Sequence, residues 1–230
     1  MTALDLLEEQ TALLLATVGA LDDLAGPSVL PGWSRGHVLG HISGNAEGLG
    51  RRARFVLDGV PRSMYESVES RNGDIEVRAT RTREQHLLAL AATHDDLMSD
   101  LAALPVDRYH DELELRMGLT MRVGQLPMMR LQEICIHHSD LAIDGYTWRD
   151  WPDELVAQFL PRVAGSFASR DDMPIGWIEA DGERLVITED VDAGLAGSGR
   201  ELFAWLTGRA PGTGLQPVGL DSVPEAPRWL

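Results

Sequence analysis

The hydrophobic and polar positions of the first 150 residues follow the period of an α-helix. Apolar residues recur every three or four positions, and each run ends at a glycine or a proline. Four long helices are expected, over residues 4–24, from Ser34 to Gly59, over residues 74–104 and over residues 127–144. Residues 112–123 alternate enough for a short hairpin or an irregular connection. Long helices with short joints predict an antiparallel four-helix bundle.

The pattern changes after Trp151-Pro152. A further helix is expected over residues 153–169, two short strands over 176–180 and 184–188, and a short helix over 198–207. Asp181-Gly182 between the two strands is a strong hairpin signal. The sequence therefore predicts an α+β chain with two domains. We expect residues 1–150 to form the four-helix bundle and residues 151–230 to form a small α/β domain.

Composition and charge narrow the function classes. The 230 residues carry 36 acids against 20 bases, a formal net charge of −16, which opposes general binding to nucleic acid or to an anionic membrane. The apolar stretches are far shorter than a bilayer span, and residues 1–10 are acidic, which is unlike a secretory signal. Cys135 is the single cysteine, so an internal disulfide and a cysteine-only zinc site are excluded. We expect a cytoplasmic enzyme, and the sequence is compatible with a monomer.

Two of the predicted helices carry polar pairs where a bundle would favour apolar residues. Glu133 and His137 lie four residues apart, as do His37 and His41, so each pair projects from one helix face. Facing helices of a bundle build metal sites in this way. Two imidazoles and one carboxylate suit Zn²⁺ and leave a fourth position open, which is typical of a catalytic site.

Simpler interpretations stay open at this point. A Glu-x-x-x-His pair also occurs as an ion pair on a helix surface. His37 is either a ligand or a solvated residue beside the site, and His138 either faces solvent or caps a neighbour. We expect three further histidines, His86, His94 and His110, at the surface because they lie in polar stretches. Cys135 is expected to be a small buried apolar residue.

Four other residues are candidates for the same site. Asp140, one turn beyond His137, either orients a ligand imidazole or lies on the helix surface. Arg71, on a predicted loop at a helix start, and Arg209, after Gly208, either bind an anion or form surface ion pairs. Asn45 either lines the cavity or bonds within the bundle.

Several sequence motifs together resemble the mycothiol-dependent maleylpyruvate isomerase family, within the DinB-like superfamily. They are LPGWSRGHVLGH at 30–41, MY at 64–65, SRNGDI at 70–75, EICIHHSDL at 133–141, residues 199–209, and VPEAPRWL at 223–230. The resemblance covers nearly the whole chain and keeps the motifs in order. It implies a DinB-like bundle followed by a small domain like that of sterol carrier proteins.

The resemblance also assigns roles to particular residues. The family's three metal ligands match His41, Glu133 and His137. Its active-site arginine matches Arg71, and a Gly-Arg pair that is expected to contact the substrate anion matches Gly208 and Arg209. His37 is then not a ligand.

The chemistry implied by the resemblance uses one Zn²⁺ per chain and mycothiol, a low-molecular-weight thiol. The cation lowers the pKa of the bound thiol. The thiolate adds to the double bond of maleylpyruvate, the new single bond rotates, and loss of the thiolate gives fumarylpyruvate, on the gentisate route of aromatic catabolism. A mycothiol S-transferase acting on another electrophile, or a metal-binding protein without turnover, are the alternatives.

Overall fold

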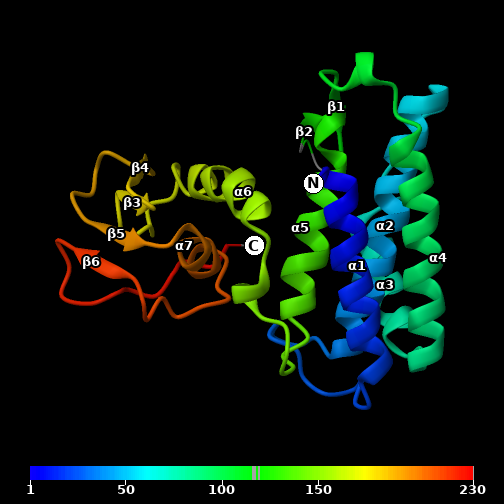
Figure 1. Ribbon diagram of the computed structural model, residues 1–230, viewed down its shortest axis with the longest axis horizontal. Helices are drawn as coiled ribbons and strands as arrows, with labels where there is room; N and C mark the ends of the chain where they lie inside the picture. Colours follow the sequence, from blue (N-terminus) through cyan, green and yellow to red (C-terminus); the bar gives the residue numbers. More distant parts are fainter. Residues whose placement is uncertain (116–117, 119, 230) are drawn as a thin grey trace. The chain divides into compact units, whose positions relative to one another are not determined.

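The chain folds into two compact units, Met1–Ala142 and Ile143–Leu230 (Figure 1). The computed structural model describes residues 1–115, 118 and 120–229. The first unit is mainly helical and the second combines helices with a sheet, so the predicted α+β class is confirmed. The change in sequence pattern near residue 150 falls just after η3 (Trp148–Asp150), which contacts helix α7 (Gly199–Leu206) and belongs to the second unit.

Four helices of the first unit form a bundle. They are α1 (Ala3–Ala20), α2 (Arg35–Asp58), α4 (Arg83–Ala102) and α5 (Leu126–Ser139). α1 and α2 each contact both α4 and α5. The pairs α1/α4 and α2/α5 are antiparallel, whereas α1/α5 and α2/α4 are parallel (Figure 1). The side chains of Thr2, Ser34 and Thr82 cap the first three of these helices.

The helix expected over residues 74–104 is two helices, so this prediction was wrong. α3 (Val68–Ala79) ends before Thr80, and α4 begins after Thr82. Thr82 and Gln85 form a capping box, in which each side chain accepts a hydrogen bond from the other residue's backbone amide. This Thr-x-x-Gln signal starts a new helix inside a segment whose apolar spacing suggested a single one.

α3 packs closely against α2 because glycines recur every fourth residue on one side of α2. Gly36, Gly40, Gly44 and Gly48 form this stripe. A Cβ atom on Gly36 would lie 2.5 Å from the carbonyl oxygen of Ala79, and one on Gly40 would lie 2.9 Å from Cβ of Arg78. Glycines in a helix interior cost stability, and here they permit the close approach of α3 to α2.

Two histidines expected at the surface are buried. His86 is fully buried in α4 and His94 is nearly so. Both lie at helical spacing with Leu90, Leu97 and Leu101, which form the buried face of α4. The polar neighbours in the sequence hid this apolar stripe. His110, the third, is exposed as predicted.

Between α4 and α5 the chain forms the short hairpin that residues 112–123 suggested. After η1 (Val106–Arg108), strand β1 (Glu112–Glu114) pairs antiparallel with β2 (Thr120–Arg122), and η2 (Val123–Gln125) leads into α5. The central residues Leu113 and Met121 face each other and are buried. The hairpin therefore has an apolar anchor on the helical unit.

The second unit is built on a four-stranded mixed sheet. Its elements are α6 (Asp153–Ser166), β3 (Trp177–Ala180), β4 (Glu183–Val186), β5 (Gly194–Gly197), α7 (Gly199–Leu206) and β6 (Gln216–Val218). The strand order is β4-β3-β5-β6, and β3 and β5 are parallel. Asp181 and Gly182 have positive φ angles in the β3–β4 turn, which confirms the predicted hairpin. Trp151 and Phe203 pack edge to face in the core.

Two expectations drawn from composition can be compared with the structure. Cys135 is fully buried in α5, as predicted, with its sulfur 3.7 Å from Oε1 of Gln10. Among the helices of the described residues, none has both the length and the hydropathy needed to cross a bilayer.

We predict that Gly36→Ala destabilises the chain, because the new Cβ would press on backbone rather than on a flexible side chain. Overpacking of this kind costs about 1–3 kcal/mol. Gly73→Ala in α3 is the matched control, because no atom lies within 4 Å of the added Cβ and alanine favours the helix by up to about 1 kcal/mol. Denaturant unfolding of both variants checks the prediction, and equal or greater stability of Gly36→Ala would contradict it.

We also predict that His86 makes stability depend on pH. Burial, with Arg81 nearby, lowers the pKa of His86 from 6.5 to about 4. Between about pH 6.5 and pH 4, His86 is therefore protonated in the unfolded chain and neutral in the folded chain. Because the unfolded state binds more protons, the free energy of unfolding falls as the pH falls through this window. Between pH 7 and pH 5, the free energy of unfolding of the unmodified chain should fall by about 2 kcal/mol more than that of His86→Leu. A stability difference that is the same at both pH values would contradict this.

Candidate metal centre

The start of α2 is held against the end of α5. Nε of Arg35 donates to the carbonyl oxygen of Leu141 (2.8 Å), and the amide of Val29 donates to that of Asp140 (2.9 Å). The guanidinium of Arg35 is a cation near the C-terminal end of α5, where the helix dipole favours positive charge. These contacts place the second turn of α2 opposite the last turns of α5.

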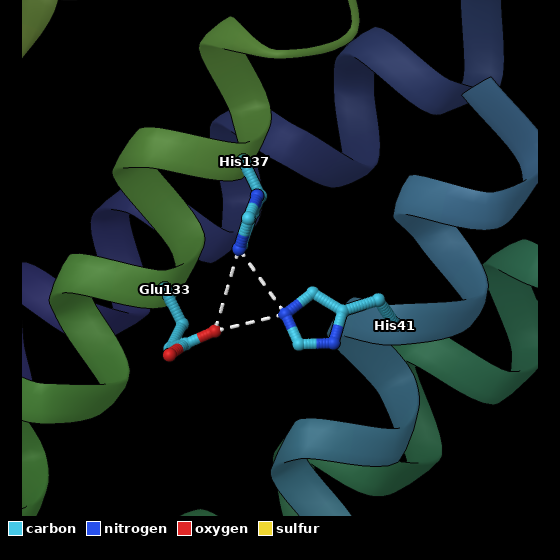
Figure 2. A group of neighbouring side chains, drawn as sticks. All are labelled: His41, Glu133 and His137. Carbon is cyan, nitrogen blue, oxygen red and sulfur yellow. Dashed lines mark hydrogen bonds and ion pairs between the residues drawn. The ribbon is translucent and has the colours of Figure 1, made fainter. Parts of the chain in front are cut away.

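At this interface His41 from α2 meets Glu133 and His137 from α5 (Figure 2). Nε2 of His41 lies 3.0 Å from Oε2 of Glu133 and 3.1 Å from Nε2 of His137, and the last two atoms are 3.5 Å apart. All three side chains point toward one another. The side chain of His41 is buried, with 8% exposed, whereas those of Glu133 and His137 keep 24% and 16% of their surface exposed.

The donor set fits a divalent cation. Ligands at about 2.0–2.1 Å around a tetrahedral ion are separated by roughly 3.3–3.4 Å, and the three observed distances lie close to that value. Two imidazole nitrogens and one carboxylate oxygen suit Zn²⁺, and three protein ligands leave one position open. The three residues that spacing and resemblance selected are therefore brought together in a geometry that could hold a metal ion.

Strong electrostatic coupling shifts the pKa values of all three groups. Burial lowers the pKa of His41 to about 4. His137 and Arg71 add to this effect, and the hydrogen bond that His41 donates to Glu133 opposes it. Burial also disfavours charge on His137, but the hydrogen bonds to Asp140 and Glu133 outweigh it and raise the pKa of His137 to about 9. Burial opposes ionisation of Glu133, yet its two histidine partners hold the pKa of this carboxyl well below its usual range.

Asp140 orients His137. Its carboxylate is fully buried, and Oδ2 accepts a hydrogen bond from Nδ1 of His137 at 2.8 Å. This bond leaves Nε2 of His137 directed at the centre of the triad. A carboxylate that holds the far nitrogen of a ligand imidazole is the usual partner of a metal-binding histidine. The structure thus places Asp140 beside the triad rather than on the outer helix surface.

Arg71 also contacts the triad, although the structure corrects its setting. The sequence suggested a loop, but Arg71 lies in α3, whose N-cap is Ser67. Nη2 of Arg71 donates to Nδ1 of His41 at 3.2 Å, and the guanidinium lies over the ring of Tyr65 at 5.7 Å. The glycine stripe of α2 is what lets α3 carry this arginine so close to His41.

A cavity of about 300 Å³ opens beside Arg71. Its lining includes Arg52, Ser63, Tyr65, Ser67, Arg71 and Glu114. Tyr65 and Arg71 also line a smaller pocket that reaches His41. The cavity therefore adjoins the pocket at His41 within the helical unit, and its charged lining residues are two arginines and two glutamates, Glu66 and Glu114.

The structure gives Asn45 a partner that sequence reasoning missed. Asn45 is buried in α2, and its Oδ1 accepts a hydrogen bond from Nη1 of Arg130 at 2.8 Å. Arg130 lies one turn before Glu133 on α5 and is itself almost completely buried. The sequence did carry a signal for this contact, because Arg130 lies three residues before Glu133 and therefore near the same face of α5.

The remaining candidates lie elsewhere. His37 belongs to the capping box of α2 with Ser34, and its Nε2 lies 3.3 Å from Oε2 of Glu76, so it is not part of the triad. His138 is buried, with Nε2 2.9 Å from Oγ1 of Thr17. Arg209 follows α7 in the second unit, where its Nη1 donates to the carbonyl oxygen of Thr207.

The fold and this site define a two-unit protein whose helical bundle carries a candidate metal centre. A family model described as the mycothiol maleylpyruvate isomerase N-terminal domain matches residues 7–142. The chain belongs to the mycothiol maleylpyruvate isomerase family.

Solved structures agree with this assignment at the level of the fold. The crystal structure of a mycothiol-dependent maleylpyruvate isomerase matches with a TM-score of 0.89 and 22% sequence identity, covering 99% of this chain and 95% of that chain. The crystal structure of a mutant of such an isomerase matches with the same TM-score and coverage at 21% identity. A comparison with curated proteins finds no sequence match.

Proposed function

We propose that the protein is a zinc- and mycothiol-dependent cis–trans isomerase that converts maleylpyruvate to fumarylpyruvate. The observation that carries this proposal is the convergence of His41, Glu133 and His137 in a chain of this family. Each chain would hold one Zn²⁺ through these three residues. When bound, Zn²⁺ supplies a Lewis acid that lowers the pKa of a thiol, and mycothiol supplies the thiolate that adds reversibly to the substrate double bond.

The protein side chains then have separate tasks. Asp140 keeps Nδ1 of His137 hydrogen-bonded, so that Nε2 is offered to the cation. A neutral imidazole that gives Nε2 to a cation carries its proton on Nδ1. With its proton on Nδ1, His41 would no longer accept a hydrogen bond from Arg71. The guanidinium of Arg71 would then be available to a ligand in the neighbouring cavity.

Charge supports a role for Arg71 on the substrate anion. A dianionic substrate that approaches a chain of net charge −16 needs local positive charge. Arg71 and Arg52 line the 300 Å³ cavity of the helical unit together with two carboxylates, Glu66 and Glu114, and of the two arginines Arg71 also lines the pocket at His41. We propose Arg71 as the active-site arginine and Arg209, from the second unit, as a further contact for the substrate anion.

The first prediction from this proposal concerns metal content. The purified chain should carry one Zn²⁺, and His41→Ala, Glu133→Ala and His137→Ala should each reduce it well below one per chain, because each removes a third of the donors. His37→Ala is the control and should keep its zinc, since His37 is engaged in the helix cap. Elemental analysis after dialysis provides the measurement, and full zinc in all three variants would rule out the site.

The second prediction concerns the thiol. The chain should convert maleylpyruvate to fumarylpyruvate with mycothiol, and glutathione should not restore the rate efficiently. A spectroscopic assay with each thiol and with none measures this. A product that retains the sulfur would instead indicate a mycothiol S-transferase, which shares the thiolate step. Equal rates with the two thiols would contradict the proposed cofactor.

The third prediction concerns Arg71. Arg71→Ala should lower kcat/KM by about 10- to 100-fold, the equivalent of losing one charge-assisted hydrogen bond to a carboxylate. Arg71→Lys keeps the charge but loses the forked donor, so it should recover part of the rate. Zinc content and melting temperature are measured beside the kinetics. Unchanged turnover in a folded, zinc-loaded Arg71→Ala variant would remove Arg71 from the active site.

A further inference from the structure

Arg130 is a deeply buried cation close to the triad. Its side chain is almost fully excluded from solvent, with 1% of the residue exposed. Nη1 donates two hydrogen bonds, to the carbonyl oxygen of Ile42 (2.9 Å) and to Oδ1 of Asn45 (2.8 Å). Nε is buried without a hydrogen-bond partner.

Such burial opposes stability. A guanidinium in a protein interior is costly unless a carboxylate pairs with it, and an apolar side chain of similar size often serves the fold as well or better. In the part of the chain that the structure describes, no carboxylate forms an ion pair with Arg130. Its partners are neutral oxygens, and Glu133 favours its charge only from a longer range. A contribution to bundle stability therefore does not explain this arginine.

The two acceptors lie on α2 at the positions that matter for the triad. Ile42 directly follows His41, and Asn45 is one turn further along the same helix. Arg130 itself is one turn before Glu133 on α5. The two hydrogen bonds consequently tie α5 to α2 within about one turn of the residues that each helix contributes.

We propose that Arg130 and Asn45 form a clamp that sets the register of α5 against α2. This register keeps the donor atoms of His41, Glu133 and His137 within 3.0–3.5 Å of one another, close enough to share one metal ion. Both act as positioning residues and neither contacts the metal or the substrate. The proposal rests on the proposed metal site. Ligand distances in metal sites stay within about 0.2 Å of their usual values, so a small shift of α5 along α2 should weaken zinc binding. Of the two roles that the sequence left open for Asn45, lining the cavity or bonding within the bundle, this proposal uses the second.

The test is the zinc affinity of purified variants, measured by competition with a chromophoric chelator. Arg130→Met removes both hydrogen bonds and keeps a long apolar side chain, while Asn45→Ala removes one acceptor and leaves the arginine. Each should raise the Kd for zinc, by about 10- to 100-fold for Arg130→Met, as is usual when the residues that position metal ligands are changed. Arg130→Lys should fall between Arg130→Met and the unmodified chain, because a single ammonium replaces the fork.

Thr17→Val is the matched control. It removes the hydrogen bond between Thr17 of α1 and His138 of α5 and leaves α2 unchanged. The melting temperature should fall while the Kd for zinc stays unchanged. A double variant, Arg130→Met with Asn45→Ala, should bind zinc about as weakly as Arg130→Met alone, because the two residues act through one contact.

The outcomes separate this proposal from the proposed function. Suppose that the unmodified chain binds zinc and that Asn45→Ala and Arg130→Met bind it as tightly as the unmodified chain and Thr17→Val do. The clamp is then overturned and the metal site stands. If Arg130→Met does not fold, Asn45→Ala decides, since it leaves the arginine and the Ile42 contact in place. If Asn45→Ala changes only the KM and leaves the Kd for zinc unchanged, Asn45 is a substrate contact and the clamp is overturned. Failure of the unmodified chain to bind zinc would overturn both proposals.

Discussion

Three polar donor atoms meeting 3.0–3.5 Å apart are the feature on which the helical unit depends. A carboxylate and two imidazoles at this distance must share either protons or a cation. Without a metal, His41 stays neutral, whereas the pKa of about 9 keeps His137 an imidazolium at neutral pH. It donates Nδ1–H to Asp140 and holds a second proton on Nε2, facing Glu133. A divalent cation would release that proton, because it binds the neutral imidazole. The same close geometry therefore lets the three side chains compensate one another's charge without a metal and lets them bind a divalent cation together.

The surrounding structure serves this meeting of α2 and α5. Asp140 fixes the far side of His137, and Arg130 with Asn45 joins the two helices one turn away. On its other side, the glycine stripe of α2 admits α3, which brings Arg71 to His41 and to the cavity. Residues that cost stability, namely the helical glycines and a buried arginine, are thus gathered around the site. This is the pattern expected where function rather than stability sets the sequence.

Much of this could be predicted from the sequence, and the failures have physical reasons. Helical periodicity located the bundle, and the four-residue spacing of Glu133 and His137 identified a shared face. Periodicity missed the break at residues 80–82, because a local capping box competes with a continuous apolar pattern. It also placed His86 at the surface, because polar neighbours hid the Leu90 stripe. The bond between Arg130 and Asn45 joins residues far apart in the sequence, and such packing is invisible to local patterns. The roles of Arg209 and of the ligands themselves stay predictions.

The most direct test of the central claim is an anomalous-difference map from crystals of the zinc-loaded protein, collected above the zinc absorption edge. The account predicts one peak per chain, enclosed by Nε2 of His41, the carboxylate of Glu133 and Nε2 of His137, at about 2.0–2.2 Å from each. A fully loaded crystal whose zinc peak lies elsewhere, or one with density at the triad that is not a metal, would contradict it.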